Sequence, residues 1–400
     1  MPAVGPRCYK RRMWTANRLS NLPPYLFDEI DRRKREAIAA GRDVIDFGVG
    51  DPDQPTHGFI VDRMAEAIRN PGNHRYALGV GSMDFRAAVA RFFNNRFGVS
   101  LDPASEIIAL LGSKEAIGHL PTAVINPGET VLVPEPGYPV YTSGAVFAGA
   151  ECHYMPLREK ADWLPVLEDI PVEVRRKAKL LYLNYPNNPT GACASRPFFE
   201  RAVSFAREYG TLIAHDAAYS EMYFDDGSPP PSILQIDGAK EVAVELHSLS
   251  KTFNMTGWRI GFAVGNKEAL AALAKVKNNI DSGVFGAVQQ AGIAALDGIN
   301  RTEILDQIQS YRRRRDILVA GLREAGWTVS SPKATFYVWA RCPSGFHSME
   351  VVKRLLDEAD VVAIPGVGFG PSGEGYVRFA LTVNEDRTRA AAERIAHVAW

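Results

Sequence analysis

The stretch Ser248-Leu-Ser-Lys-Thr-Phe-Asn-Met-Thr-Gly-Trp-Arg259 separates two short apolar runs, residues 242–246 and 260–264. Runs of this kind, bounded by turn residues, predict strands that are buried on both faces of a sheet. The stretch between them therefore presents two serine hydroxyls, one lysine and one arginine at the end of a sheet. Burial there would make the lysine amine easier to deprotonate and hence nucleophilic. Taken alone, the stretch is equally compatible with Lys251 as an ordinary solvated lysine.

The chain around this stretch alternates short apolar runs with helical patterns. Further strands are expected at residues 131–133, 180–183 and 212–214, and helices at residues 85–97, 115–124, 197–209 and 267–277. Alternation of strands and helices predicts a doubly wound α/β domain with a mostly parallel sheet. In such a domain the ligand binds beyond the carboxyl ends of the strands, where the loops gather.

The last hundred residues follow an α+β pattern instead. We expect helices at residues 303–325, 349–359 and 385–398, strands at 327–329, 335–340 and 376–381, and a Gly-rich loop at 366–370. A short strand at 44–47 is expected to pack against this part. The sequence thus predicts a large α/β domain at 51–299 and a smaller α+β domain built from 21–50 and 300–400. Residues 1–20, which carry a basic run without an apolar segment, are expected to form a flexible arm.

Composition excludes several classes of function. The 400 residues hold 46 Lys and Arg against 46 Asp and Glu, whereas nucleic-acid binders normally carry a basic excess. No stretch approaches 18 uninterrupted apolar residues, so no membrane span is expected. The four cysteines are scattered, which predicts neither a disulfide framework nor a metal site. We expect a cytoplasmic protein that binds no metal, no nucleic acid and no membrane.

A second motif, Asn184-Tyr-Pro-Asn-Asn-Pro-Thr-Gly191, ends the strand at 180–183, and its two prolines restrict the backbone. Asp216 follows Asn188 by 28 residues, which is the length of one strand–helix–strand unit. Asn188, Asp216 and Lys251 are therefore expected to end neighbouring strands at one edge of the sheet. An ordinary proline turn would explain the first motif alone, but three converging polar groups indicate a binding site.

Two places offer donors for a phosphate. Ser248, Ser250 and Arg259 lie in one loop, and the arginine presents a planar fork of N–H groups. The sequence Gly112-Ser-Lys opens a predicted helix, so the backbone N–H groups of Ser113 and Lys114 would face an anion. A dinucleotide site is the competing interpretation, but no G-x-G-x-x-G follows a predicted strand.

Together these motifs resemble the pyridoxal-phosphate aminotransferases of fold type I, classes I and II. The resemblance runs from about Leu22 to the C-terminus and rests on the segments NYPNNPTG, HDAAYSE and SLSKTFNMTGWRIGF. The sequence is most similar to LL-diaminopimelate aminotransferases and their alanine-aminotransferase relatives. This resemblance implies a mostly parallel seven-stranded sheet between helices, a smaller α+β domain, and pyridoxal 5'-phosphate as the cofactor.

The resemblance also implies a role for each matching residue. Lys251 would form the Schiff base and then act as general acid and base, and Asp216 would keep the ring nitrogen protonated. Tyr138 would stack on the ring, and Asn188 and Tyr219 would bond its phenolic oxygen. The implied phosphate ligands are Ser113, Lys114, Ser248, Ser250, Arg259 and, from a partner subunit, Tyr76. The implied substrate ligands are Arg378, Asn188, Gly50, Tyr25, Lys114 and, from a partner subunit, Ser282.

A borrowed tyrosine requires at least a homodimer, with residues 279–285 expected at its interface. The implied reaction moves an amino group between an L-amino acid and a 2-oxo acid. An idle domain that senses a ligand is the least favoured alternative, because the leader before Asn21 is too short for a DNA-binding domain.

One loop departs from the resemblance. Diaminopimelate aminotransferases usually carry a glutamate between the tyrosine and the glycine that match Tyr76 and Gly81, whereas residues 77–80 here are Ala, Leu, Gly and Val. Loss of that carboxylate removes a charge-assisted bond to a distal ammonium, about 1.5–3 kcal/mol. Neutral drift of the loop explains the difference if Asp84 or another acid compensates. The alternative is another amino acid, or another reaction on the same scaffold, such as γ-elimination or carbon–carbon bond formation.

Overall fold

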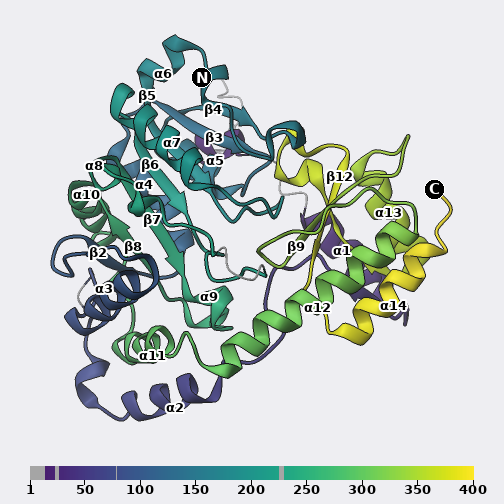
Figure 1. Ribbon diagram of the computed structural model, residues 1–400, viewed down its shortest axis with the longest axis horizontal. Helices are drawn as coiled ribbons and strands as arrows, with labels where there is room; N and C mark the ends of the chain where they lie inside the picture. Colours follow the sequence, from purple (N-terminus) through teal and green to yellow (C-terminus); the bar gives the residue numbers. More distant parts are fainter. Residues whose placement is uncertain (1–13, 23–26, 78, 225–228) are drawn as a thin grey trace, which may run out of the picture.

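The computed structural model describes residues 14–22, 27–77, 79–224 and 229–400. Its largest element is a seven-stranded sheet, seen on the left of Figure 1. The strands lie in the order β2 (Ile107–Leu110), β8 (Gly261–Gly265), β7 (Ala243–Ser248), β6 (Leu212–Asp216), β5 (Ala178–Asn184), β3 (Thr130–Glu135) and β4 (Glu151–Pro156). Only β8 runs antiparallel to its neighbours. The mostly parallel seven-stranded sheet is therefore confirmed.

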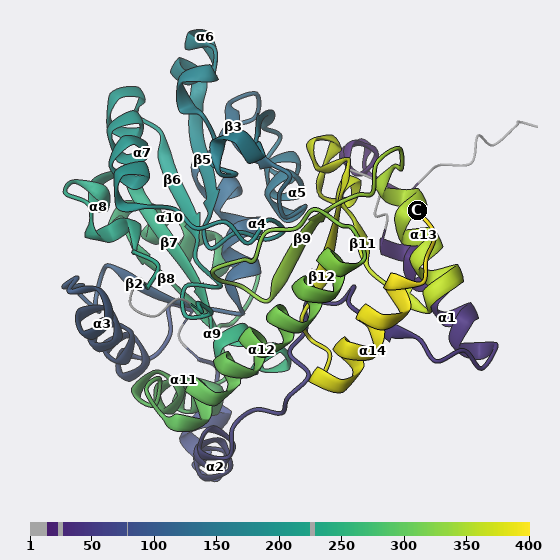
Figure 2. The same cartoon turned by 45° about the vertical axis from the view of Figure 1, so that its right-hand side comes forward.

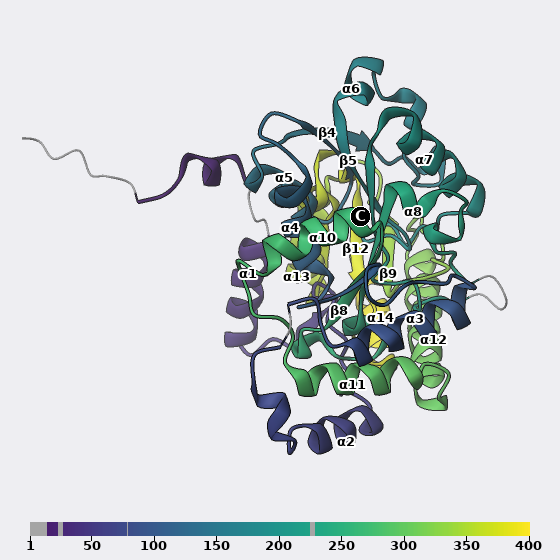
Figure 3. The same cartoon turned by 90° about the vertical axis from the view of Figure 1, so that its left-hand side faces the viewer.

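Helices cover both faces of this sheet, as Figure 3 shows from the side. One face packs against α4 (Ser113–Val124), α5 (Val140–Phe147) and α10 (Lys267–Lys277), and the other against α3 (Met83–Phe97), α7 (Arg196–Tyr209) and α11 (Gly286–Asp297). Side chains along a strand alternate between the two faces. In β6, Ile213 belongs to the core beside α7 and Ala214 to the core beside α4. Successive side chains of a strand therefore pack into the cores on opposite faces of the sheet.

The C-terminal part forms its own core around two small sheets (Figure 2). The antiparallel sheet has the order β11 (Ile364–Pro365), β12 (Tyr376–Ala380) and β9 (Tyr337–Arg341), and β1 (Ile45–Asp46) pairs with β10 (Val361–Val362). These strands pack with α1 (Phe27–Ala39), α12 (Thr302–Glu324), α13 (Ser348–Ala359) and α14 (Glu385–Ala396). The expected strand near residue 45 therefore joins the C-terminal part, although its residues pair with residues of β10 that lie 316 positions later in the chain.

The remaining helices are α2 (Gly58–Ala67), α6 (Val172–Lys177), α8 (Ala239–Val242) and α9 (Leu249–Thr252), together with short 3₁₀ turns. None of the helices within the described ranges is long and apolar enough to cross a membrane.

One expected strand was wrong, and the structure also contains elements that were not expected. Residues 327–329 form no strand, only an isolated bridge from Val329 to Ala340, because Gly326 has a φ of +82° and the chain turns there. The expected loop at 366–370 contains a 3₁₀ turn, Gly366–Phe369. The edge strand β4 was not expected, since its sequence Glu-Cys-His-Tyr-Met-Pro has no apolar run and most of its side chains are exposed or half-buried.

Candidate functional site

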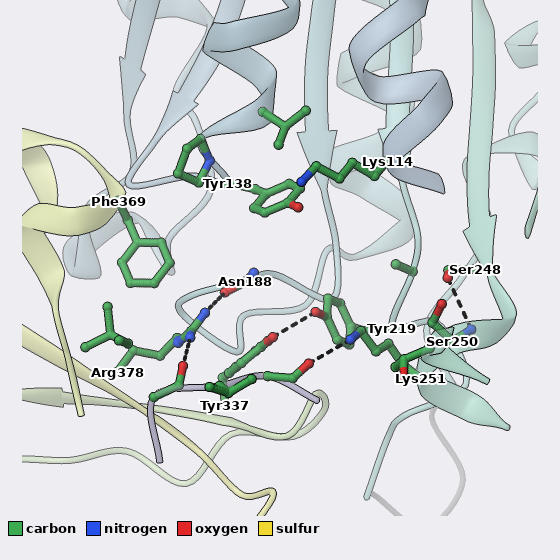
Figure 4. Close-up of a pocket in the computed structure, with 18 of the residues that line it drawn as sticks. Lys114, Tyr138, Asn188, Tyr219, Ser248, Ser250, Lys251, Tyr337, Phe369 and Arg378 are labelled. Carbon is green, nitrogen blue, oxygen red and sulfur yellow. Dashed lines mark hydrogen bonds between the residues drawn. The ribbon is translucent and has the colours of Figure 1, made fainter. Parts of the chain in front are cut away.

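A cavity of about 570 Å³ lies between the carboxyl edge of the large sheet and the small sheets (Figure 4). Twelve of the residues expected at the site line it, namely Gly50, Ser113, Lys114, Tyr138, Asn188, Asp216, Tyr219, Ser248, Ser250, Lys251, Arg259 and Arg378. The fold thus gathers in one place residues that are up to 328 positions apart in the chain.

Three neighbouring strands bring the polar groups to one edge. Asn184 at the end of β5 pairs in register with Asp216 at the end of β6. Asp216 in turn pairs with Leu246 of β7, which ends at Ser248 just before Lys251. The expected convergence of Asn188, Asp216 and Lys251 at adjacent strand ends is confirmed.

Asp216 is buried and held by two donors. Tyr141 Oη donates to Asp216 Oδ2 at 2.8 Å, and the backbone N–H of Ala218 donates to Oδ1 at 3.3 Å. Burial raises the pKa of Asp216, and the hydrogen bond from Tyr141 acts in the opposite direction. The carboxylate is thereby placed in the cavity with a fixed orientation.

Lys251 lies at the bottom of the cavity, and its Nζ donates to the Gly50 carbonyl at 2.7 Å. Burial lowers the pKa of Lys251 to about 8, with Asp51 opposing the shift and the charges of Arg378 and Arg259 adding to it. About one molecule in ten then carries a neutral amine at pH 7, compared with fewer than one in a thousand for an ordinary lysine. This amine is suited to attack a carbonyl.

The Asn-Pro motif after β5 is locked by its own side chains. Asn184 Nδ2 donates to the Asp216 carbonyl at 2.8 Å, and Asn184 Oδ1 accepts the backbone N–H of Asn188 at 2.8 Å. Asn187 Oδ1 accepts from both the N–H and the hydroxyl of Thr190. These bonds fix the position from which the Asn188 side chain enters the cavity.

Donors gather around the first turn of α4. The helix begins at Ser113 after Gly112, whose φ of +81° suits glycine, and a Cβ on Gly112 would lie 2.4 Å from Arg259 Nη2. Ser248 Oγ accepts the backbone N–H of Ser250 at 3.2 Å (Figure 4). Backbone N–H groups, hydroxyls and a guanidinium thus meet around space that only a glycine leaves open, which is the donor set that a phosphate requires.

Arg378 lies on the middle strand of the antiparallel sheet and is 5% exposed. Its Nη1 donates to Asn188 Oδ1 at 3.0 Å and its Nη2 to the Gly48 carbonyl at 2.7 Å, as the dashed lines of Figure 4 show. Its Nε is buried and has no hydrogen-bond partner within the described part of the chain. The rings of Tyr337 and Phe369 pack against the guanidinium at 4.4 and 4.8 Å. Burial lowers the pKa of Arg378; a guanidinium held in this way is suited to a carboxylate.

Two tyrosines of the site were missed by the sequence analysis. Tyr141 bonds Asp216, and Tyr337 Oη lies 3.0 Å from Tyr219 Oη. A Cβ on Gly50 would lie 2.1 Å from Tyr337 Oη, so this tyrosine also requires the glycine. The position of Tyr141, three residues after Tyr138 at the start of a helix, could have indicated its direction. The position of Tyr337 in a strand carried no such signal.

Two of the expected site residues do not line the cavity. Tyr76 is 92% exposed and Ser282 is exposed, so neither reaches the cavity of its own chain. Tyr25 lies outside the described residues. Among the described residues no group of His, Cys, Asp or Glu is arranged to hold a metal ion.

Known proteins that are similar in sequence match nearly the whole chain. The family model for aminotransferase class I and II matches residues 42–395. An LL-diaminopimelate aminotransferase of Syntrophobacter fumaroxidans is 53% identical over 96% of this chain and 99% of its own length. One from Aquifex aeolicus is 52% identical over 96% and 98%.

Solved structures of similar proteins have the same fold as this chain. Substrate-bound BacF from Bacillus subtilis superposes with a TM-score of 0.93 at 38% identity, covering 97% of this chain and 98% of that chain. A mutant aspartate aminotransferase of Thermus thermophilus superposes with a TM-score of 0.90 at 28% identity, covering 97% and 100%.

Proposed function

Because this chain belongs to the class I and II aminotransferases, which use pyridoxal 5'-phosphate, we propose that it transfers an amino group from LL-diaminopimelate to a 2-oxo acid. The observation that carries the proposal is the meeting of Lys251, Asp216, Asn188 and Arg378 around one cavity. The choice of amino acid follows relatives that are 50–53% identical over nearly their full length and bear that name.

The residues of the cavity fit the cofactor. When bound, it supplies an aldehyde that joins to amines and a ring that stabilises negative charge at the substrate Cα. Ser113, Lys114, Ser248, Ser250 and Arg259 would hold its phosphate, because their donors surround the first turn of α4. Tyr138 would stack on its ring, and Asn188 and Tyr219 would donate to its phenolic oxygen.

Lys251 would hold the cofactor covalently and later move a proton at the substrate Cα. Both tasks require an amine that loses its proton near neutral pH, which agrees with a pKa of about 8. Asp216 would accept a hydrogen bond from the protonated ring nitrogen. The bond from Tyr141 opposes the effect of burial on the pKa of this carboxylate and fixes its orientation.

Arg378 would bind the α-carboxylate of the substrate, assisted by Asn188 and the backbone at Gly50. The contacts of the guanidinium are with carbonyl, amide and aromatic groups, so a bound carboxylate would supply a countercharge that these contacts do not. Lys114 and Tyr25 remain proposed ligands for the rest of the substrate.

We further propose a homodimer in which Tyr76 and Ser282 complete the partner's cavity. Their exposure in one chain supports this, because it leaves both side chains accessible to a partner subunit. The exposed Ile280 and Phe285 lie in the same predicted interface, residues 279–285.

Two further expectations stay predictions. They are the domain limits, at 51–299 and at 21–50 with 300–400, and a cytoplasmic location.

A second candidate function has one observation in its favour. Val80, at the position where a glutamate is usual, packs against the core beside α4 and offers no carboxylate. A site without that charge would suit a different amino acid, or γ-elimination or carbon–carbon bond formation on the same scaffold.

A substrate screen separates these functions. Purified protein would be incubated with LL-diaminopimelate or other amino acids plus 2-oxoglutarate, and products identified by mass. Glutamate formed in equal amount to the amino acid consumed is expected for LL-diaminopimelate. Consumption without glutamate, accompanied by an eliminated or condensed product, would contradict transamination. Val80→Glu tests the loop separately: unchanged activity on diaminopimelate would show that this position does not read the distal ammonium.

A further inference from the structure

A buried charged network lies on the opposite face of the large sheet from the cavity, and none of the roles above uses it. The network consists of His215 on β6 with Glu245 and His247 on β7, which are 0%, 0% and 4% exposed. The rings of Phe199, Phe93 and Phe262 enclose its two histidines at centroid distances of 4.9–5.2 Å. We call these three residues the Glu245 network.

Glu245 accepts four hydrogen bonds and is therefore the anion of the network. Its Oε2 accepts from Ser232 Oγ at 2.8 Å, from the backbone N–H of Ile233 at 2.8 Å and from His215 Nδ1 at 3.1 Å. Its Oε1 accepts from His247 Nε2 at 2.7 Å. Although burial alone would raise it, the bonds from the two histidines lower the pKa of Glu245 below its usual range.

His215 is the cation that balances this charge. Its Nδ1 faces the Glu245 carboxylate, and its Nε2 faces the carbonyl of Tyr185 at 2.9 Å. Both neighbours only accept hydrogen bonds, so both ring nitrogens must carry a proton. His247 differs, because its second nitrogen faces the Ser220 hydroxyl, 3.5 Å away, which is able to donate. The network is thus an ion pair of His215 and Glu245, with His247 bonded to the second carboxylate oxygen of Glu245.

The network connects the three strands whose ends line the cavity. On each strand, one residue that belongs to the network or contacts it is the direct sequence neighbour of a residue that lines the cavity. Tyr185 follows Asn184, His215 precedes Asp216, and His247 precedes Ser248. Alternation along the strands sends these side chains to the α7 face while their neighbours face the cavity. The bonds from Tyr185 through His215 and Glu245 to His247 therefore cross-link β5, β6 and β7 directly behind the site.

An ion pair inside an aromatic core contributes little net free energy to holding the strands together. Desolvating two charges offsets most of their attraction, and apolar side chains of similar volume are often as stabilising. The position of the His215 cation next to Asp216 has a second effect, on the charge of that carboxylate. His215 and His247 both act to lower the pKa of Asp216 against its burial, so the network favours the ionised carboxylate.

We infer that His215, held by Glu245, is a positioning residue that keeps Asp216 ionised and in register for the ring nitrogen of the cofactor. The inference rests on the proposed function, because only a bound pyridine ring gives the charge of Asp216 a task. Asp216 lies between His215 and the cavity, so the cation acts on the carboxylate more strongly than on a ring beyond it. Without the cation, the shared proton would move from the ring nitrogen toward Asp216.

The test compares His215→Gln with Phe199→Leu in the holoenzyme. Glutamine keeps one hydrogen bond and removes the charge. Phe199→Leu disturbs the same core, since its ring packs on His215 at 4.9 Å, but it leaves both bonds of the histidine in place. The readouts are kcat, KM for the amino donor, Tm, and the ¹⁵N shift of labelled pyridoxal phosphate, which reports protonation of the ring nitrogen.

We expect His215→Gln to lower kcat about 10-fold or more with KM changed less than about 2-fold, and to move the ¹⁵N shift toward the unprotonated value. Phe199→Leu should lower Tm while keeping kcat within about 2-fold and the ¹⁵N shift unchanged. If both variants give the same kcat and shift, the network is only structural and the inference is overturned.

A milder variant covers the case in which His215→Gln does not fold. Ser232→Ala removes one of the four donors to Glu245 and should move the ¹⁵N shift in the same direction by a smaller amount. An unchanged shift in that variant overturns the inference. Failure of the proposed function is recognised separately, because the wild-type protein would then bind no labelled cofactor or form no glutamate.

Discussion

The two ends of the cavity are built in different ways. At the large-sheet end, Asn184, Asp216 and Ser248 follow directly from the ends of three adjacent parallel strands, and backbone register sets their spacing. At the small-sheet end, Arg378 meets a carbonyl of Gly48, 330 residues away, through a single side-chain hydrogen bond. The first end depends on the regular backbone of one sheet, and the second on how separate segments pack. We therefore expect substitutions at the two ends to affect different measured quantities.

The largest effect is expected at the large-sheet end. Lys251→Ala removes the amine that we propose both binds the cofactor and carries the proton, so kcat should fall about 10⁴-fold or more while the fold persists. The measurements are steady-state turnover, circular dichroism, and borohydride reduction followed by peptide mass analysis. Lys179→Ala, an exposed lysine on β5, is the matched control and should behave like wild type. Retained activity in Lys251→Ala would refute the assignment.

At the small-sheet end, Arg378→Gln should lower kcat/KM about 10²–10³-fold, chiefly through KM, because the proposed ligand of the substrate carboxylate loses its charge-assisted pair of hydrogen bonds. Cofactor absorbance should stay as in wild type. Arg394→Gln is the control: Arg394 pairs with Asp43 at the surface, and its loss should change kcat/KM by less than about 2-fold. Loss of the cofactor from Arg378→Gln would mean that the two ends are not independent.

The contact between the ends can be tested at Gly50, whose carbonyl accepts from Lys251 and whose Cα faces Tyr337. A Cβ there would lie 2.1 Å from Tyr337 Oη, so Gly50→Ala should lower kcat/KM about 10-fold. Because Tyr337→Phe removes that oxygen, Gly50→Ala should have a smaller effect in the Tyr337→Phe background. Gly58→Ala, where a Cβ meets nothing within 4 Å, is the control. Equal effects in both backgrounds would contradict the steric explanation.

The smallest expected effect is a dependence on pH. The lowered pKa of Lys251, about 8, means that its amine becomes neutral as pH rises through that value. The rate at which the apoenzyme binds pyridoxal phosphate should therefore increase about 5-fold from pH 7 to 8 and level off above pH 9. Stopped-flow absorbance measures this rate. A rate that still rises about eightfold between pH 9 and 10 would indicate an ordinary lysine pKa.

Most of the large-sheet end could be predicted from the sequence, although Tyr141 was missed. Short apolar runs that alternate with helical patterns indicate a parallel sheet, and one strand–helix–strand interval between Asn188 and Asp216 puts both side chains at the same edge. Family motifs then identified Lys251 and Arg259. Local spacing carries this information because register and strand order leave little freedom at the ends of parallel strands.

The small-sheet end and the buried ion pair were determined only by the tertiary structure. Whether Arg378 is buried, which carbonyl it meets and that Tyr337 lies over Gly50 depend on contacts between segments far apart in the chain. The ion pair of His215 and Glu245 likewise becomes visible only when β6 and β7 lie side by side. Charge, burial and the number of available donors are properties of the packed neighbourhood, so no pattern within one segment encodes them.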